Sequence, residues 1–230
     1  SIIWLNVDMM YGIEYEEFPA RIAEVAMWLI DHQMNMLISN EFGQYFARLP
    51  LKKSAKIVHG DALEVNWEDV VAKNQLSYII GNPPFIGSKI MSQFQRNQII
   101  KEFDNSKGCG VLDYVSGWYL KAAKYIQNTK IKTAFVSTNS IVQGEQTSIL
   151  WGQMLNKYGV KIHFAHRTFK WSNEAKGNAA VYCIIVGFAN FDIKNKVLFE
   201  YEDIKGEPQA IQVKNINPYL VDAKDIFIEK

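Results

Sequence analysis

The tetrapeptide Asn82-Pro83-Pro84-Phe85 combines residue types that can bind a planar ligand, and its position in the chain favours that role. The apolar run from Tyr78 to Ile80 predicts a short buried strand just before it. Because proline lacks the N–H that a sheet requires, the two prolines take the chain out of that strand. Ligands of open α/β sheets bind beyond the carboxyl ends of the strands. The sequence thus predicts a binding site here, and the alternative is a proline-rich exit turn with a core phenylalanine.

The chemistry that these four residues offer is the activation of an aryl amine. The side-chain oxygen of Asn82 and the backbone carbonyl of Pro83 only accept hydrogen bonds, so together they can hold both hydrogens of an amine. An aryl amine is a poor nucleophile because its lone pair is delocalised into the ring. Acceptors that favour a pyramidal nitrogen release that lone pair and lower the barrier to alkylation. The ring of Phe85 would stack on the aromatic system that carries the amine.

Two carboxylates follow other predicted strands. Glu14 ends the expected strand Met9–Glu14, just before a helix that has Pro19 in its first turn. Asp61 follows the expected strand Ala55–His59. A carboxylate at such a strand end can accept hydrogen bonds from both hydroxyls of a ribose, or one from the amine of a bound base. The pair therefore suggests an adenosyl-type cofactor, and the alternatives are an exposed loop glutamate and a turn or cap aspartate.

Later segments add polar and aromatic residues. The polar segment Ile86–Gly110 is expected to be a solvated helix face or loop, or else to contact a phosphate backbone. Asp113 lies near the start of an expected helix, Val111–Gln127, where capping is its default role. A polar cluster, residues 137–146, follows an expected strand, Thr133–Val136, and faces the same crevice.

The aromatic pair Phe169 and Trp171 lies between two further predicted strands, residues 160–165 and 179–188. A short polar link between these strands predicts an antiparallel pair. Residues two apart share a face of an extended chain, so both rings could flank a planar ligand or belong to the core. His163 and His166, three apart, would lie on opposite faces, and we predict no metal site.

The composition bounds the class of protein. With 230 residues, 48% hydrophobic and 21% charged, the chain is long and apolar enough for one large or two small globular domains. The apolar runs are too short to span a bilayer. A net charge of +1 indicates no global basic field for nucleic acid. Two cysteines, Cys109 and Cys183, do not make a disulfide framework, which suits a reducing compartment.

The motifs resemble a known family. Asn82-Pro83-Pro84-Phe85 matches the catalytic tetrapeptide of amino-group DNA methyltransferases that use S-adenosylmethionine. The segments Gly12–Ala23, Gly81–Gly87, Leu112–Val115 and Phe169–Ala175 resemble MmeI-type restriction–modification enzymes. The resemblance implies a Rossmann-like class I methyltransferase sheet with a C-terminal antiparallel hairpin. It also implies methylation of an adenine flipped out of double-stranded DNA, in the bacterial cytoplasm, with nuclease and target-recognition domains on the same polypeptide.

The resemblance assigns a role to individual residues. Glu14 would bind the cofactor ribose, Asp61 and the Ala62 backbone would bind its adenine, and the target amine would lie between Asn82 and Pro83. The full set is cofactor binding by Glu14, Tyr15, Asp61 and Ala62, catalysis by Asn82, Pro83, Pro84 and Phe85, and target-base contact by Phe169 and Trp171.

The chain also departs from the family pattern. The first strand and the Gly-rich cofactor loop should precede Gly12, and only eleven residues do. We therefore expect an N-terminally truncated fragment that is inactive by itself and whose sheet has a gap or an altered pairing. We expect residues 1–190 to be the partial catalytic domain and 191–230 an extension toward a target-recognition domain. The alternatives are methylation of RNA or of a protein glutamine amide, or an inactive scaffold.

Overall fold

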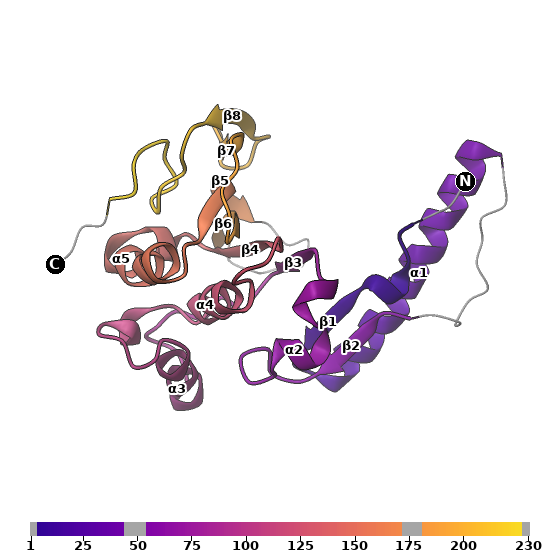
Figure 1. The fold of residues 1–230 in the computed structure, drawn as a ribbon, viewed down its shortest axis with the longest axis horizontal. Helices are drawn as coiled ribbons and strands as arrows, with labels where there is room; N and C mark the ends of the chain where they lie inside the picture. The colour runs from indigo at the N-terminus through magenta and orange to yellow at the C-terminus, as the bar shows by residue number, and fades with distance from the viewer. Residues whose placement is uncertain (1–3, 44–53, 172–180, 227–230) are drawn as a thin grey trace. The chain divides into compact units, whose positions relative to one another are not determined.

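The computed structural model of the protein describes residues 4–43, 54–171 and 181–226. The chain divides into two compact units, residues 1–72 and 73–230 (Figure 1).

The first unit is a short parallel strand pair with one long helix. Its elements are β1 (Tyr11–Glu14), α1 (Glu17–Phe42), β2 (Lys56–His59) and α2 (Trp67–Val70). β1 pairs with β2 so that Glu14 lies opposite His59. α1 ends at Gly43, whose left-handed backbone (φ 61°) lets its N–H bond the Ser39 carbonyl. The predicted strand–helix–strand order is confirmed, although Met9 lies in a 3-10 turn before β1.

The apolar row of α1 is exposed rather than buried. Phe18, Ile22, Val25 and Leu29 follow helical spacing, and each is about half exposed or more. The residues of this helix that are fully buried are Ala20, Asn35 and Ser39. The helical pattern in the sequence thus predicts the helix, but its apolar stripe is not the face that packs within this unit.

The second unit contains a mixed six-stranded sheet in the order β3-β4-β6-β5-β7-β8. Its strands are β3 (Tyr78–Gly81), β4 (Lys132–Thr138), β5 (Lys161–Trp171), β6 (Val181–Ala189), β7 (Lys196–Glu200) and β8 (Gln209–Val213). β3 runs parallel to β4 and β5 runs parallel to β7, whereas the other neighbours are antiparallel. The predicted antiparallel pair is therefore β5 and β6, and the link between them lies outside the described residues.

The described strands form two sheets, β1–β2 in the first unit and the six-stranded sheet in the second. The expected gap in the sheet and its expected cause stay predictions.

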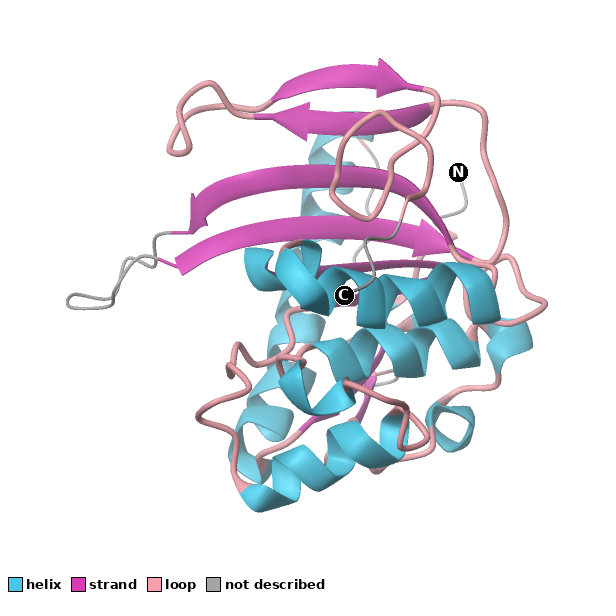
Figure 2. Ribbon diagram, turned by 90° about the vertical axis from the view of Figure 1, so that its left-hand side faces the viewer, coloured by secondary structure: helices cyan, strands magenta, loops and turns pink. Residues whose placement is uncertain are grey.

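Helices α4 (Ser116–Tyr125) and α5 (Gly144–Gly152) pack on one face of the six-stranded sheet, and Figure 2 shows helices on this side of the long strands. The helix α3 (Gln93–Glu102) packs against α4. Tyr119 of α4 is fully buried, and its ring lies 5.3 Å from Phe135 of β4, 5.6 Å from Phe188 of β6 and 5.8 Å from Trp151 of α5. This aromatic cluster is the centre of the core and fixes α4 and α5 against β4 and β6.

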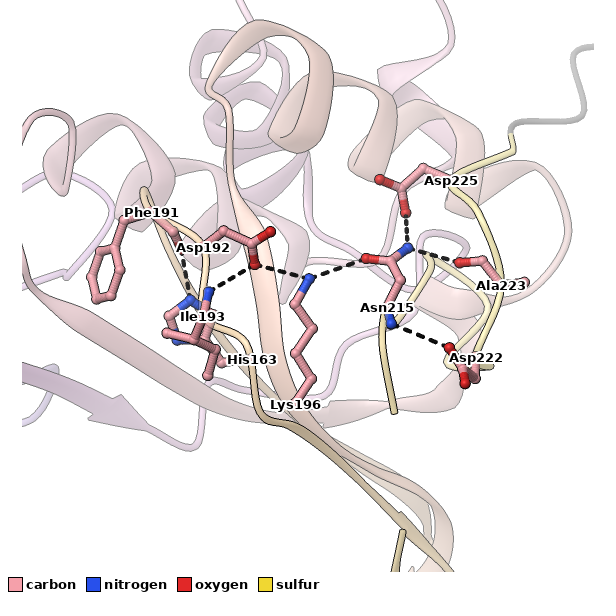
Figure 3. Close-up of polar contacts among 9 residues, drawn as sticks. All are labelled: His163, Phe191, Asp192, Ile193, Lys196, Asn215, Asp222, Ala223 and Asp225. Carbon is pink, nitrogen blue, oxygen red and sulfur yellow. Dashed lines mark hydrogen bonds and ion pairs between the residues drawn. The ribbon is translucent and has the colours of Figure 1, made fainter. Parts of the chain in front are cut away.

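The C-terminal residues hold more structure than the sequence predicts. We expected residues 191–230 to be an extension toward a target-recognition domain and predicted no strands there, whereas the structure has β7 and β8, which extend the sheet from β5. A buried lysine at the start of β7, Lys196, holds the chain segment that follows β8 (Figure 3). The Nζ of Lys196 lies 2.9 Å from a carboxylate oxygen of Asp192 and 3.1 Å from the side-chain oxygen of Asn215. Asn215 in turn donates to the Ala223 carbonyl at 2.7 Å. The domain boundary at residue 190 stays a prediction.

Both cysteines are free and buried. Burial raises the pKa of the Cys183 thiol to about 11, so this thiol is poorly reactive at neutral pH. Within the described ranges, the structure contains no helix long and apolar enough to cross a membrane.

Candidate functional site

The carboxyl end of β3 is set by a close contact with β4. Gly81 pairs with Phe135, and a Cβ on Gly81 would lie 3.2 Å from the Cδ1 and Cε1 atoms of that ring. Phe135 is 2% exposed and cannot easily move. A glycine is therefore needed where β3 delivers the chain to Asn82.

The tetrapeptide follows β3 without regular secondary structure. Asn82 and Pro84 are exposed, Pro83 is buried and Phe85 is half-buried. The Pro84 carbonyl accepts from the Ile86 N–H at 3.2 Å. The Asn82 amide thus faces solvent while the buried Pro83 ring fixes the backbone beside it. A polar acceptor on a rigid strand exit is the arrangement that the sequence predicts, and what it binds stays a proposal.

The chain after the tetrapeptide is tied down at three points. The Ile86 carbonyl accepts from the Tyr114 N–H at 2.9 Å, and the Ser88 N–H donates to the Asp113 carboxylate at 3.0 Å. Arg96 of α3 donates to the Ser88 carbonyl at 2.8 Å and to the Gly110 carbonyl at 3.3 Å. The segment from Ile86 to Ser88 is therefore held by backbone and charge-assisted hydrogen bonds.

Asp113 does not cap a helix, so our expected role for it is wrong. α4 begins only at Ser116, and no side chain caps it. The carboxylate instead accepts from Ser88, from Ser140 and from Gln146, the last at 3.3 Å. The polar cluster that follows β4 thus points at Asp113.

The acids of the first unit lie at the carboxyl ends of two paired strands. Glu14 ends β1 and is half-buried, and one of its carboxylate oxygens accepts from the Glu16 N–H at 3.3 Å. Asp61 follows β2 and accepts from the Leu63 N–H at 2.8 Å. The Gly60 N–H donates to the Glu14 carbonyl at 2.8 Å, which ties the two strand exits together. Asp61 therefore shapes its own turn, as the alternative interpretation expects, and also lies at the edge where a ligand would bind.

The remaining cofactor candidates flank these acids. Tyr15 is 67% exposed directly after Glu14. The Ala62 carbonyl accepts from the Trp67 indole at 2.9 Å, so the turn after Asp61 is braced by a buried tryptophan.

An aromatic cluster lies on the sheet face opposite α4 and α5. Phe169 and Trp171 share this face, as predicted, with ring centroids 6.0 Å apart. Tyr201, just after β7, stacks on Phe169 at 5.4 Å, and its hydroxyl lies 2.8 Å from His166 Nδ1. His166 stacks on Phe199 at 4.1 Å.

The sequence did not reveal that His166 and Tyr201 belong to this cluster. A register shift between His166 and Phe169 adds a residue to β5, so residues three apart come to the same face. Tyr201 reaches the cluster only through the pairing of β7 with β5. Neither the bulge nor the long-range pairing has a local sequence signal, so the sequence could not show that His166 and Tyr201 join the cluster.

The candidate residues divide between the two units. Glu14, Tyr15, Asp61 and Ala62 belong to residues 1–72, whereas the tetrapeptide, Phe169 and Trp171 belong to residues 73–230. In the part of the chain that the structure describes, no group of three His, Cys, Asp or Glu residues is arranged to hold a metal ion.

Comparison with known proteins places the chain in a family. A model described as the DNA-methyltransferase domain of MmeI matches residues 2–200. The chain belongs to this family. The chain is also similar to DNA methyltransferase A of Bacillus subtilis (strain 168), with 40% identity over 228 residues, which are 97% of this chain and 25% of that protein.

A solved structure agrees closely with this fold. The Type IIL restriction-modification enzyme MmeI, in complex with DNA, is 55% identical with a TM-score of 0.92 over 97% of this chain and 30% of its own. The type IIG restriction endonuclease BpuSI shares only the fold, at 11% identity and a TM-score of 0.57 over 84% of this chain and 21% of its own. The predicted α/β methyltransferase fold is confirmed. The chain spans about a quarter to a third of the length of its MmeI-family relatives.

Proposed function

We propose that this chain is the catalytic part of a DNA methyltransferase that uses S-adenosylmethionine and modifies the exocyclic amine of a flipped-out adenine. The observation that carries the proposal is the exposed Asn82 amide on a fixed exit from β3, in a chain of the MmeI methyltransferase family. Bases in a duplex are stacked and paired, so an enzyme that modifies the amine must take the base out of the helix.

Asn82 and Pro83 hold the target amine in this proposal. Each offers an oxygen acceptor, and the two acceptors bind the two amine hydrogens while the nitrogen lone pair turns toward the methyl donor. Phe85 stacks on one face of the adenine, and Phe169 with Trp171 contacts it from the aromatic cluster. Acceptors fixed in advance stabilise the transition state without reorganising during the reaction.

The residues of the first unit fit the donor molecule. Glu14 and Asp61 place two carboxylates at neighbouring strand ends, and such acceptors suit ribose hydroxyls and an adenine amine. Tyr15 lies beside them, and the Ala62 N–H can donate to the adenine ring. The bound donor supplies an electrophilic methyl group on a sulfonium. Glu14 and Asp61 orient it, and no covalent intermediate forms on the protein.

The wider setting follows from the relatives. Because the chain spans 25–30% of their length, we propose that the same polypeptide carries nuclease and target-recognition domains that bind double-stranded DNA. A DNA substrate places the enzyme in the bacterial cytoplasm, and two free, buried thiols suit such a reducing compartment.

Product identification tests this proposal. The full-length protein is incubated with S-adenosylmethionine labelled on its methyl group and with DNA, RNA and protein substrates in parallel. We expect label in DNA, recovered as N6-methyl-2′-deoxyadenosine after digestion to nucleosides. Label in RNA or in a protein glutamine, with none in DNA, would overturn the DNA assignment, and no transfer to any substrate would favour a scaffold.

A further inference from the structure

Asp113 joins segments that are far apart in the sequence. Its carboxylate accepts from the Ser88 N–H at 3.0 Å and from Ser140, and its N–H donates to the Gln146 side-chain oxygen at 2.9 Å. The Gln146 amide nitrogen returns to the carboxylate at 3.3 Å, so the two residues clasp each other. Thr138, the last residue of β4, bonds Ser140 at 2.8 Å and extends the network to the strand end.

These contacts are shielded from solvent. Asp113 is 9% exposed and lies at the end of a loop, next to the fully buried Leu112 and Val115. A buried carboxylate is tolerated only when hydrogen bonds replace its water, and several donors from different segments do so here. Hydrogen bonds to a charged group are stronger than those between neutral groups, so this network can fix a loop.

The loop that the network fixes is the one that follows the tetrapeptide. Ser88 is three residues beyond Phe85, and the neighbouring Tyr114 N–H bonds the Ile86 carbonyl at 2.9 Å. Residues 113 and 114 thus hold the Ile86–Ser88 segment, which follows the tetrapeptide. The pairing of Gly81 with β4 holds the chain just before the tetrapeptide. The tetrapeptide is clamped at both ends.

We propose that Asp113 is a positioning residue for methyl transfer: it fixes the segment after Phe85 to the carboxyl end of β4 and so sets the geometry of the Asn82 and Pro83 acceptors. This inference rests on the proposed function. Asp113 contacts neither substrate nor cofactor in this account, and it acts only through Ser88 and Tyr114. Displacement of reacting groups by about 1 Å costs on the order of 10²-fold in rate, which is the effect expected when the clamp opens.

Two substitutions separate this role from a general role in folding. Asp113→Ala removes every side-chain acceptor. Asp113→Asn keeps one oxygen for Ser88 and Gln146, and its new N–H₂ can donate to Ser140, whose hydroxyl can rotate. The matched control is Thr129→Ala, which removes two hydrogen bonds, of 2.7 and 3.2 Å, before β4 begins at Lys132, at the opposite end of the strand.

Steady-state kinetics of the full-length protein on DNA give the main test. We expect Asp113→Ala to lower kcat about 10²-fold, with the KM values for DNA and for S-adenosylmethionine nearly unchanged, and Asp113→Asn to restore most of kcat. Thr129→Ala should lower the melting temperature and leave kcat intact. Wild-type kcat in Asp113→Ala, or an equal loss in Thr129→Ala, would overturn the proposal.

A second measurement, amide hydrogen exchange, tests the clamp without relying on methyl-transfer activity. Amide hydrogen exchange of the peptide that contains Ser88 should become faster in Asp113→Ala than in wild type, and unchanged exchange would overturn the clamp. Should Asp113→Ala not fold, Gln146→Ala removes one anchor and should show the same pattern in weaker form, and wild-type exchange and kcat there would contradict it. Absence of methyl transfer by the wild-type protein refutes the proposed function alone, because the exchange result stands by itself.

Discussion

Single residues determine how the chain leaves β3. Gly81 lets the backbone approach Phe135, Pro83 is buried, and the exposed Asn82 lies between them. The chemistry proposed for Asn82 depends on these neighbours because an amide oxygen binds an amine only from a defined position.

Gly81→Ala tests the close approach. Its new Cβ would lie 3.2 Å from two ring atoms of Phe135, and that ring is packed against Tyr119 and Phe188. The backbone at Asn82 must therefore shift. We expect a clear loss of kcat with a destabilisation of about 1–2 kcal/mol, measured by chemical denaturation beside the methylation assay. Unchanged kcat would show that the ring yields and that the tetrapeptide is not held through Gly81.

His163 gives a residue-scale prediction about pH. Burial holds the pKa of His163 below its usual 6.5, although its hydrogen bond to the Phe191 carbonyl, at 2.7 Å, opposes this. Burial also lowers the pKa of His166. The unfolded chain therefore takes up protons at a higher pH than the folded chain, so stability is full above about 6.5 and falls as the pH drops through the folded pKa values.

The melting temperature should accordingly fall between pH values of about 7 and 5. His163→Gln keeps an N–H donor for Phe191 without titrating, so it should reduce the slope. A slope identical to that of wild type would show that His163 remains unprotonated, or is accessible, in both states.

Among the elements, the β5–β7 pairing does the most to assemble the C-terminal part of the chain. It brings Tyr201 to Phe169, and the buried Lys196 at the start of β7 holds the segment after β8 (Figure 3). The same strands thus build the aromatic cluster and anchor the chain that follows it.

The ion pair at the start of β7 should respond asymmetrically to substitution. Lys196 is 2% exposed whereas the Asp192 side chain is 59% exposed. Asp192→Ala leaves the buried ammonium without its carboxylate and with the hydrogen bond to Asn215, and we expect a loss of about 2 kcal/mol. Lys196→Met removes the buried charge and leaves Asp192 in solvent, so its cost should be smaller. Equal losses in urea denaturation would contradict this account.

How much of the fold and the site the sequence could predict depends on how far apart the interacting residues lie in the sequence. The strand ends at Glu14, Asp61 and Asn82 rest on local apolar runs and turn residues, and the family motifs predict the fold that the comparison with MmeI confirms. The Asp113 network and the contact of Tyr201 with Phe169 depend on partners 25 to 33 residues away, so no local pattern shows them. β7 was missed because its pairing with β5 is equally long-range, and β8 joins the sheet only through β7.

On the scale of the whole molecule, the chain exposes a row of large apolar side chains on α1. The α1 row formed by Phe18, Ile22, Val25 and Leu29 is exposed, and contiguous apolar patches of this kind mark contact surfaces. We predict that the 230-residue chain, produced by itself, binds the dye ANS and self-associates.

The double variant Val25→Glu/Leu29→Glu should reduce ANS fluorescence and association measured by light scattering. Gln33→Glu, on the same helix and already exposed, is the matched control and should change neither. Equal behaviour of the two variants would show that the α1 row is covered in solution.

Transfer of a labelled methyl group to DNA by Asn82→Ala, in the full-length protein, tests the central claim most directly. Loss of one preorganised hydrogen-bonding group costs about 10²–10³-fold in kcat, so we expect a loss of at least that size. Binding of S-adenosylmethionine, measured by calorimetry on the same sample, should stay close to that of wild type because Glu14 and Asp61 are unchanged. Full methylation by Asn82→Ala would contradict the account.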